Sequence, residues 1–168
     1  MNVWEKNVRK VTPYTPGEQP KVDDVIKLNT NECPYPPSPK VVEALENMNK
    51  DKLRLYPDPD ATKLVDSFAE YYNLNSNQVF VVVGSDDVIG MAFLTFFNSD
   101  NPILFPDITY SFYDVWADLF KIKYETKKLD DNFNIKVEDY FEPNGGVIFP
   151  NPNAPTSIEI SLDSIEEI

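Results

Sequence analysis

Three short polar segments of this sequence carry residue types that can bind a ligand, and each follows an apolar run. They are residues 84–87, 106–113 and 150–157. A glycine before a helix lets an anion reach backbone N–H groups, a tyrosine ring can stack on a planar ligand, and an asparagine can donate to a ligand oxygen. Each segment also has a plain structural interpretation, as a helix cap, a core ring or an Asx-turn. Only a shared location would turn the three segments into one binding site.

The composition excludes several other kinds of chemistry. The 168 residues include no histidine and one cysteine, Cys33, which rules out Ser-His-Asp and Cys-His nucleophile systems, an intrachain disulfide and a cysteine metal cluster. A net charge of −13 disfavours binding to nucleic-acid phosphates. No apolar run approaches the ~20 residues of a membrane span, and residues 1–10 lack the apolar region of a signal peptide. We therefore expect a soluble, cytoplasmic protein that acts on a small molecule, with no metal, nucleic-acid or membrane partner.

The elements that would position the three segments are an alternation of strands and helices. Residues 79–83, Val-Phe-Val-Val-Val, form a continuous apolar run that predicts a strand buried on both faces. The pattern after it predicts strands at residues 102–105, 122–126 and 146–149, helices at residues 86–97 and 110–120, and a last helix capped by Ser161. Such alternation is typical of an α/β fold with a mostly parallel sheet flanked by helices. Ligands bind at the carboxyl ends of the strands in such sheets, which is where all three polar segments fall.

The first 60 residues show a different pattern. Residues 1–38 carry many prolines and little periodicity, so we expect an extended arm that lies on another surface, such as a second subunit. Ser38 and Pro39 then predict the start of a helix. Asp60 predicts the cap of a second helix, whose apolar stripe should face inward.

Five stretches of the chain together match one known family. They read Leu-Asn-Thr-Asn-Glu-Cys-Pro-Tyr at residues 28–35, Tyr-Pro-Asp-Pro-Asp-Ala-Thr-Lys-Leu at 56–64, Val-Gly-Ser-Asp-Asp at 83–87, Pro-Asp-Ile-Thr-Tyr-Ser-Phe-Tyr at 106–113 and Asn-Pro-Asn-Ala-Pro-Thr at 151–156. In their order and spacing the chain resembles, over essentially its whole length, the class I and II aminotransferases, which are fold-type-I pyridoxal-phosphate enzymes. The first two stretches are similar to the histidinol-phosphate branch of that family. The resemblance implies amino transfer between histidinol phosphate and 2-oxoglutarate, a step of histidine biosynthesis, with pyridoxal 5′-phosphate as the cofactor.

The resemblance also implies a cofactor site built from the segments at the strand ends. Gly84 and the backbone amides of Ser85 and Asp86 would hold the cofactor phosphate, and Tyr110 would stack on the pyridine ring. These roles suit the chemistry, because a dianionic phosphate fits a helix N-terminus and a flat conjugated ring fits an aromatic neighbour. Residues 39–168 would then form an incomplete large cofactor-binding domain, the N-terminal part of the pyridoxal-phosphate-dependent transferase large domain, preceded by residues 1–38 as a Pro-rich arm.

The segment at residues 151–156 departs from the family pattern, which usually reads Asn-Pro-X-Asn-Pro-Thr-Gly. Ala154 stands where the second asparagine of the family touches the cofactor, and Ser157 replaces the closing glycine. Asn153 is then the nearest donor to the phenolic oxygen of the cofactor, and Asn151 is the alternative.

Other implied roles involve a second subunit or residues outside this sequence. Tyr56 would reach the cofactor phosphate of a neighbouring subunit in a homodimer, and Tyr14 and Asn31 would help to form the substrate pocket. The family's Schiff-base lysine, the acid at the pyridine nitrogen and an arginine near the phosphate lie beyond Ile168, so the 168 residues alone are expected to be inactive. Two other interpretations stay open. One is a decarboxylase of the same superfamily that acts on a phosphorylated amino acid, and the other is a non-catalytic truncated domain.

Overall fold

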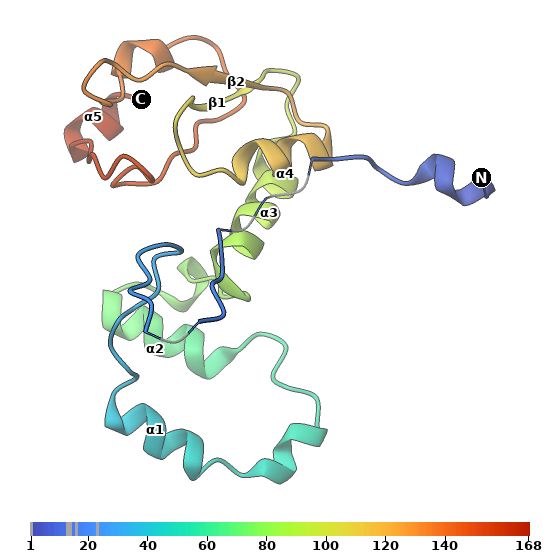
Figure 1. Cartoon of the computed structure of the whole chain (residues 1–168), viewed down its shortest axis with the longest axis vertical. Coiled ribbons are helices and arrows are strands. Elements are labelled where there is room, and N and C mark those ends of the chain that lie inside the picture. The colour runs from blue at the N-terminus through green and yellow to red at the C-terminus, as the bar shows by residue number, and fades with distance from the viewer. Residues whose placement is uncertain (1, 13–14, 16, 23) are drawn as a thin grey trace. The chain divides into compact units, whose positions relative to one another are not determined.

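The structure is a computed structural model that describes residues 2–12, 15, 17–22 and 24–168. Its helices and strands are traced along the chain in Figure 1. The chain divides into two compact units, one made of Met1–Tyr14 with Val82–Ile168 and the other of Thr15–Val81. The sheet and the three polar segments belong to the first unit.

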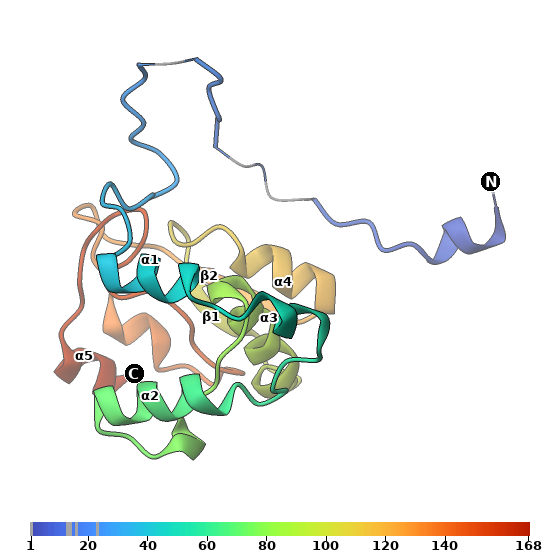
Figure 2. The same cartoon turned by 90° about the horizontal axis from the view of Figure 1, so that it is seen from below.

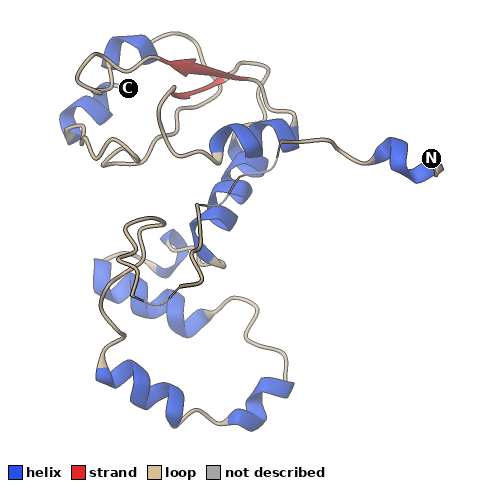
Figure 3. Ribbon diagram, viewed as in Figure 1, coloured by secondary structure: helices blue, strands red, loops and turns tan. Residues whose placement is uncertain are grey.

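The sheet of the first unit is parallel, as the alternation of strands and helices predicts. Strand β1 (Ile103–Pro106) pairs in parallel with β2 (Tyr124–Lys127), with Ile103 opposite Tyr124, and Figure 3 shows the two strands side by side. On the other edge of β1, Val147 forms a parallel bridge with Leu104. Leu104 donates its N–H to the carbonyl of Gly146 over 2.9 Å and accepts from the N–H of Ile148 over 3.0 Å. The segment predicted as a strand at residues 146–149 therefore extends along the sheet beside β1.

Helices α3 (Gly84–Phe96) and α4 (Tyr113–Phe120) bury the central strand. The buried core joins one residue of α3, two of β1 and two of α4, namely Phe93, Ile103, Phe105, Tyr113 and Ala117. Figure 2 shows the two helices beside the strands. All four residues of β1 are buried, which is why its sequence is a plain apolar run rather than an alternating one. Helix α5 (Leu162–Glu167) follows, and Ser161 caps it as predicted, since its side chain accepts from the N–H of Ser164.

The strand predicted at residues 79–83 does not form. The segment is extended but pairs with no strand of the described chain, and its Phe80 and Val83 side chains are 68% and 87% exposed. An apolar run can become a strand buried on both faces only where other strands flank it. Here β1 is already paired on both edges, and the segment ends in a tight turn in which the N–H of Gly84 donates to the carbonyl of Val82 over 3.1 Å.

The second unit is helical. It contains α1 (Pro39–Glu46) and α2 (Thr62–Tyr72), with short 3₁₀ turns at Lys50–Arg54 and Ser76–Gln78. Helix α1 begins at Pro39, as the sequence predicts. The apolar faces of both helices remain open within the described chain, because Ala69 is the one buried residue in them, whereas the stripe of α2 was predicted to face inward.

The cap of α2 also differs from the sequence prediction. Asp58, not Asp60, satisfies the first turn, since its carboxylate accepts from the N–H of Thr62 over 2.8 Å and from the N–H of Asp60 over 3.1 Å. The N-cap position itself is Ala61 in a left-handed conformation, with φ 48°. That turn carries the chain past Asp60 and leaves Asp58 opposite the helix start. These hydrogen bonds lower the pKa of the Asp58 carboxyl below its ordinary value, with the side-chain hydrogen bond to Thr62 as the largest cause.

The arm expected at residues 1–38 contains one regular element among its described residues, a 3₁₀ turn at Val3–Asn7. The guanidinium of Arg9 donates to the carbonyl of Leu119 at the end of α4, so this part of the arm lies on the first unit. No helix in the described part of the chain combines the length and the apolar character needed to cross a membrane.

Candidate functional site

The candidate site lies at the carboxyl end of β1, where the chain leaves the sheet and passes the start of α3. The hydroxyl of Tyr110, in the loop between β1 and α4, donates to Oδ1 of Asp86 in the first turn of α3 over 2.7 Å. Both side chains are half-buried. Two of the three polar segments are thus joined directly, as the sheet topology predicts.

The N-terminus of α3 has the features of an anion site. Gly84, its first residue, has φ +82°, and a Cβ built there would meet no atom within 4 Å, so the glycine is required by its backbone conformation rather than by crowding. The N-cap residue is Val83, whose side chain cannot accept a hydrogen bond. The N–H groups of the first helical turn have no acceptor inside the helix. The N–H of Gly84 already donates to Val82, but because Gly84 and Ser85 are exposed, the N–H groups that follow it in this turn can meet a phosphate oxygen.

Asp86 and Asp87 lie in this same first turn and would oppose an anion if their carboxylates faced it. One oxygen of the Asp86 carboxylate is occupied by the Tyr110 hydroxyl. Asp87 is exposed, so water screens its charge. The acidic first turn is therefore compatible with a phosphate on the backbone N–H groups.

The ring of Tyr110 is also held by aromatic neighbours. It stacks with Phe112 at a centroid distance of 5.8 Å and an interplanar angle of 25°, and it meets Tyr113 edge-on at 5.8 Å and 71°. Tyr113 is a core residue, and burial raises the pKa of its hydroxyl to about 12. From the sequence alone, Tyr110 could either pack in the core or stack on a ligand. The structure places Tyr113 in the core and leaves Tyr110 half-buried at the strand end.

The third polar segment reaches the same loop through Asn153, which is 2% exposed. Its Oδ1 accepts from the Thr109 hydroxyl over 2.8 Å, and its Nδ2 donates to the carbonyl of Ile108 over 2.9 Å and to the Thr156 hydroxyl over 3.2 Å. Its backbone N–H also donates to the carbonyl of Ile158 over 2.8 Å. The buried amide thus ties residues 151–158 to the loop that carries Tyr110.

Asn151, the alternative donor, is exposed and lies at the start of the same segment. Its side chain pairs with the backbone of Ile160, donating to the carbonyl over 3.1 Å and accepting from the N–H over 3.0 Å. Ala154, which stands in the family's asparagine position, follows Asn153 directly and is half-buried. All three polar segments therefore converge at one edge of the sheet.

A cavity of about 370 Å³ opens beside Tyr110, at the ends of β1 and β2. Asp107, Thr109, Tyr124 and Thr126 contribute to its wall. Tyr124 has a raised hydroxyl pKa, chiefly because of burial and also because Asp118 and Asp114 are near. Within the described residues no cluster of three cysteine or acidic side chains could hold a metal ion.

The remaining predicted site residues belong to the second unit or lie outside the description. Tyr56 is fully exposed. Asn31 is exposed and has φ 51°, and Thr30 before it has φ 61°, so the chain turns sharply there. Tyr14 lies outside the described residues.

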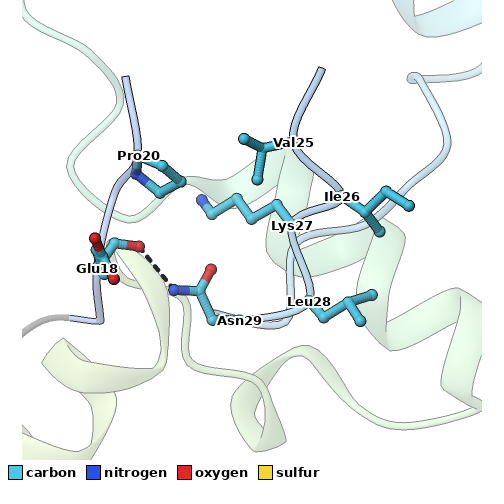
Figure 4. A pocket seen from close by; sticks show the side chains of 7 residues that line it. All are labelled: Glu18, Pro20, Val25, Ile26, Lys27, Leu28 and Asn29. Carbon is cyan, nitrogen blue, oxygen red and sulfur yellow. Dashed lines mark hydrogen bonds between the residues drawn. The ribbon is translucent and has the colours of Figure 1, made fainter. Parts of the chain in front are cut away.

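An open cavity of about 360 Å³ that the sequence did not predict lies between residues 18–20 and residues 25–29 (Figure 4). Asn29 lines it and donates from Nδ2 to the carbonyl of Glu18 over 2.7 Å. The Lys27 ammonium donates to Oε1 of Gln19 over 2.8 Å and pairs with the Glu32 carboxylate. The hydrogen bond that Lys27 donates to the Glu32 carboxylate is the largest cause of the lowered pKa of Glu32.

Sequence reasoning also missed the contact of the Asp86 side chain with Tyr110, because it considered Asp86 as a helix cap, for its backbone amide and for its charge. Asp86 and Tyr110 are 24 residues apart in different elements, so no local spacing signals their contact. The only available signal was the sheet topology, which places both segments at one edge.

The chain is similar to characterised proteins along most of its length. The aminotransferase class I and II family matches residues 23–168. The chain is 57% identical over 165 residues to histidinol-phosphate aminotransferase 1 of Hydrogenovibrio crunogenus, covering 98% of this chain and 46% of that protein. It is 53% identical over 165 residues to the histidinol-phosphate aminotransferase of Clostridium botulinum, covering 98% of this chain and 47% of that protein. The chain thus spans about half the length of the curated relatives it matches.

Two solved structures share the fold. One is a protein from Erwinia carotovora atroseptica assigned as a histidinol-phosphate aminotransferase, with a TM-score of 0.71 and 25% identity over 82% of this chain and 41% of that chain. The other is a protein from Burkholderia pseudomallei assigned as an aminotransferase, with a TM-score of 0.70 and 17% identity over 82% of this chain and 42% of that chain. The second likeness concerns the fold alone. Together they confirm the predicted α/β class with a helix-flanked parallel sheet.

Proposed function

The chain belongs to the aminotransferase class I and II family, and from that premise we propose that it forms the N-terminal part of a histidinol-phosphate aminotransferase. The reaction is amino transfer between histidinol phosphate and 2-oxoglutarate. The observation that carries this proposal is the 57% identity, over 98% of the chain, to a protein of that name. The two stretches at residues 28–35 and 56–64, which are typical of the histidinol-phosphate branch, support it from the sequence.

The proposed cofactor is pyridoxal 5′-phosphate. Gly84 and the free N–H groups of Ser85 and Asp86 bind its phosphate, because a dianion is stabilised at a helix N-terminus. The half-buried ring of Tyr110 stacks on the pyridine ring. When bound, the cofactor supplies an electron-withdrawing ring that stabilises negative charge on the substrate carbon. The protein residues orient that ring and keep it in place.

The donor to the phenolic oxygen comes from residues 151–156. Asn153 is the proposed donor, and Asn151 is the alternative. The Asn153 amide already donates to Ile108 and Thr156, so contact with the cofactor would require it to exchange or share one of these bonds. The Asn151 amide is exposed and makes one of its two possible donations to Ile160.

The complete enzyme is proposed to be a cytoplasmic homodimer in which Tyr56 of one subunit reaches the phosphate bound by the other. Tyr14 and Asn31 line the substrate pocket. Residues 1–38 act as the arm and residues 39–168 as part of the large cofactor-binding domain. The full exposure of Tyr56 supports a role outside its own unit.

The lysine that family members use for covalent attachment of the cofactor has no counterpart among residues 1–168, according to the resemblance. We therefore assign these residues to phosphate binding, ring stacking and substrate binding. Proton transfer at the substrate carbon belongs to the family lysine.

A chimeric enzyme tests the proposal. This chain replaces the matched N-terminal 46% of the Hydrogenovibrio crunogenus protein, and amino transfer from histidinol phosphate to 2-oxoglutarate is assayed. The expected result is transfer that the Tyr110→Ala chimera reduces at least tenfold, with no transfer by the C-terminal portion alone. A folded chimera that binds pyridoxal phosphate but transfers no amino group from histidinol phosphate would refute the proposal.

A further inference from the structure

We propose that the Asp86 carboxylate is a positioning residue that sets the orientation of the Tyr110 ring before any cofactor binds. This inference rests on the proposed function, in which Tyr110 is the stacking residue. It adds a role for the Asp86 side chain to the role of its backbone amide.

The geometry of the contact supports this role. The hydroxyl of Tyr110 and Oδ1 of Asp86 are 2.7 Å apart, within the range of a charge-assisted O–H···O hydrogen bond. Asp86 is anchored in the first turn of the 13-residue helix α3, whereas Tyr110 lies in an irregular loop. The hydrogen bond therefore fixes the far end of the tyrosine side chain to a residue of the helix.

The aromatic neighbours add to the constraint. Phe112 lies nearly parallel to the Tyr110 ring at 25°, and Tyr113 meets it edge-on at 71°. These contacts restrict how the ring tilts, and Tyr113 of α4, which stacks on Phe93 of α3, ties the ring to the core. The hydrogen bond to Asp86 acts at the other end of the side chain, where it fixes the tyrosine hydroxyl relative to the N–H groups of α3.

Asp87 provides a matched comparison. It is an exposed aspartate in the same first turn, so it contributes the same charge next to the same helix N-terminus. A general effect of negative charge on α3 or on a bound phosphate would appear equally in variants of Asp86 and Asp87. An effect transmitted through Tyr110 would appear only in variants of Asp86.

The first experiment uses the ligand-free 168-residue chain labelled with 3-fluorotyrosine. The ¹⁹F resonance of Tyr110 is identified by its loss in Tyr110→Phe. We expect Asp86→Ala to move this resonance toward the position of free fluorotyrosine, Asp86→Asn to move it less because an acceptor oxygen remains, and Asp87→Ala to leave it unchanged. If Asp86→Ala fails to fold, Asp86→Asn carries the comparison. A Tyr110 resonance that responds to neither Asp86 variant, or equally to Asp87→Ala, overturns the proposal.

The second experiment measures the dissociation constant of pyridoxine 5′-phosphate, which has the ring and phosphate of the cofactor but no aldehyde to react with lysines. Asp86→Ala should weaken binding about tenfold, whereas Asp87→Ala should change it less than about twofold. In the Tyr110→Phe background, Asp86→Ala should weaken binding no further. An undiminished effect of Asp86→Ala in that background means that Asp86 does not act through Tyr110 and overturns the proposal. If the unmodified chain binds no pyridoxine 5′-phosphate, the proposed function fails, and the ¹⁹F result still decides the role of Asp86.

Discussion

The Thr109 hydroxyl donates a hydrogen bond of 2.8 Å to Oδ1 of Asn153, which lies 44 residues later in the chain. The contact joins the loop after β1 to the segment that follows the extended residues beside β1. Both loops leave the sheet at the same edge, because the strands before them run parallel. This buried amide therefore sets the distance between two of the three segments that form the candidate site.

Asn153→Ala should destabilise the chain by about 1–3 kcal/mol. The substitution removes the hydrogen bonds that the buried Asn153 amide makes with the Ile108 carbonyl and the Thr109 hydroxyl. Urea unfolding followed by circular dichroism measures the loss. Asn132→Ala, at an exposed asparagine of a surface turn, is the control and should cost less than about 0.5 kcal/mol. Equal effects of the two variants would show that the Asn153 network does not stabilise the fold.

Gly84→Ala should destabilise the chain by about 1–2 kcal/mol, because φ +82° is strained for any residue with a Cβ. The added methyl group meets no atom, so a steric clash adds nothing to this cost. Ser85→Ala, one position later, is the matched control and should change stability by less than about 0.5 kcal/mol. Thermal unfolding of both variants gives the comparison, and a Gly84→Ala chain as stable as the Ser85→Ala chain would contradict the assigned conformation.

The cap of α2 should make helix content depend on pH. The folded-state pKa of Asp58 is lowered by its hydrogen bonds to Thr62 and Asp60. A lowered folded-state pKa means that the stabilisation is fully present above the unfolded-state pKa of about 4 and is lost as pH falls through the folded-state value. Far-ultraviolet circular dichroism between pH 7 and pH 2 should show this loss.

Asp58→Asn should lower the helix signal at neutral pH and flatten its acid transition, whereas Asp60→Asn should leave both nearly unchanged. The Asp60 carboxylate is the cap that the sequence predicted, so the pair of variants separates the two assignments. A larger effect of Asp60→Asn than of Asp58→Asn would show that Asp60, and not Asp58, caps α2.

The 168-residue chain alone should show no turnover of histidinol phosphate and no single reactive lysine. Treatment with pyridoxal phosphate and borohydride, followed by peptide mass spectrometry, should label several exposed lysines at comparable, low levels. One lysine labelled stoichiometrically, together with turnover, would mean that a lysine among residues 1–168 has taken over the role of the family lysine.

The sequence predicted those parts of the fold in which a local pattern and its burial agree. Parts of this kind are the apolar run that became β1, the alternating stretch that became β2, the parallel course of residues 146–149 and the cap at Ser161. Residues 79–83 have an equally clear apolar pattern but no flanking strand in the described chain, and so they stay unpaired. A hydrophobic pattern indicates which faces of a segment should be buried. A strand forms there only where neighbouring strands and helices are present to cover those faces.

The candidate site was predictable to a similar extent. Sheet topology accounts for the convergence of the segments after β1 and after residues 146–149. Residues 84–87 reach the same place although residues 79–83 form no strand, and the contact of Asp86 with Tyr110 joins them to it. The contacts within the site do not follow from sheet topology, because Asp86 with Tyr110 and Thr109 with Asn153 are long-range side-chain pairs that no local spacing encodes. The cap of α2 likewise differs from the prediction because Ala61 adopts the αL conformation and turns the backbone there. The residue types alone did not indicate this turn.

The central claim is that the N-terminus of α3 and the ring of Tyr110 form a pyridoxal-phosphate site, and the affinity of the unmodified chain for pyridoxine 5′-phosphate and for pyridoxine tests it most directly. The two compounds differ only in the phosphate, and neither can react with lysines. We expect saturable binding of the phosphorylated compound, at least tenfold weaker binding of pyridoxine, and a comparable loss in Tyr110→Ala. Equal affinities for the two compounds, or a Tyr110→Ala chain that binds the phosphorylated compound as the unmodified chain does, would contradict the account.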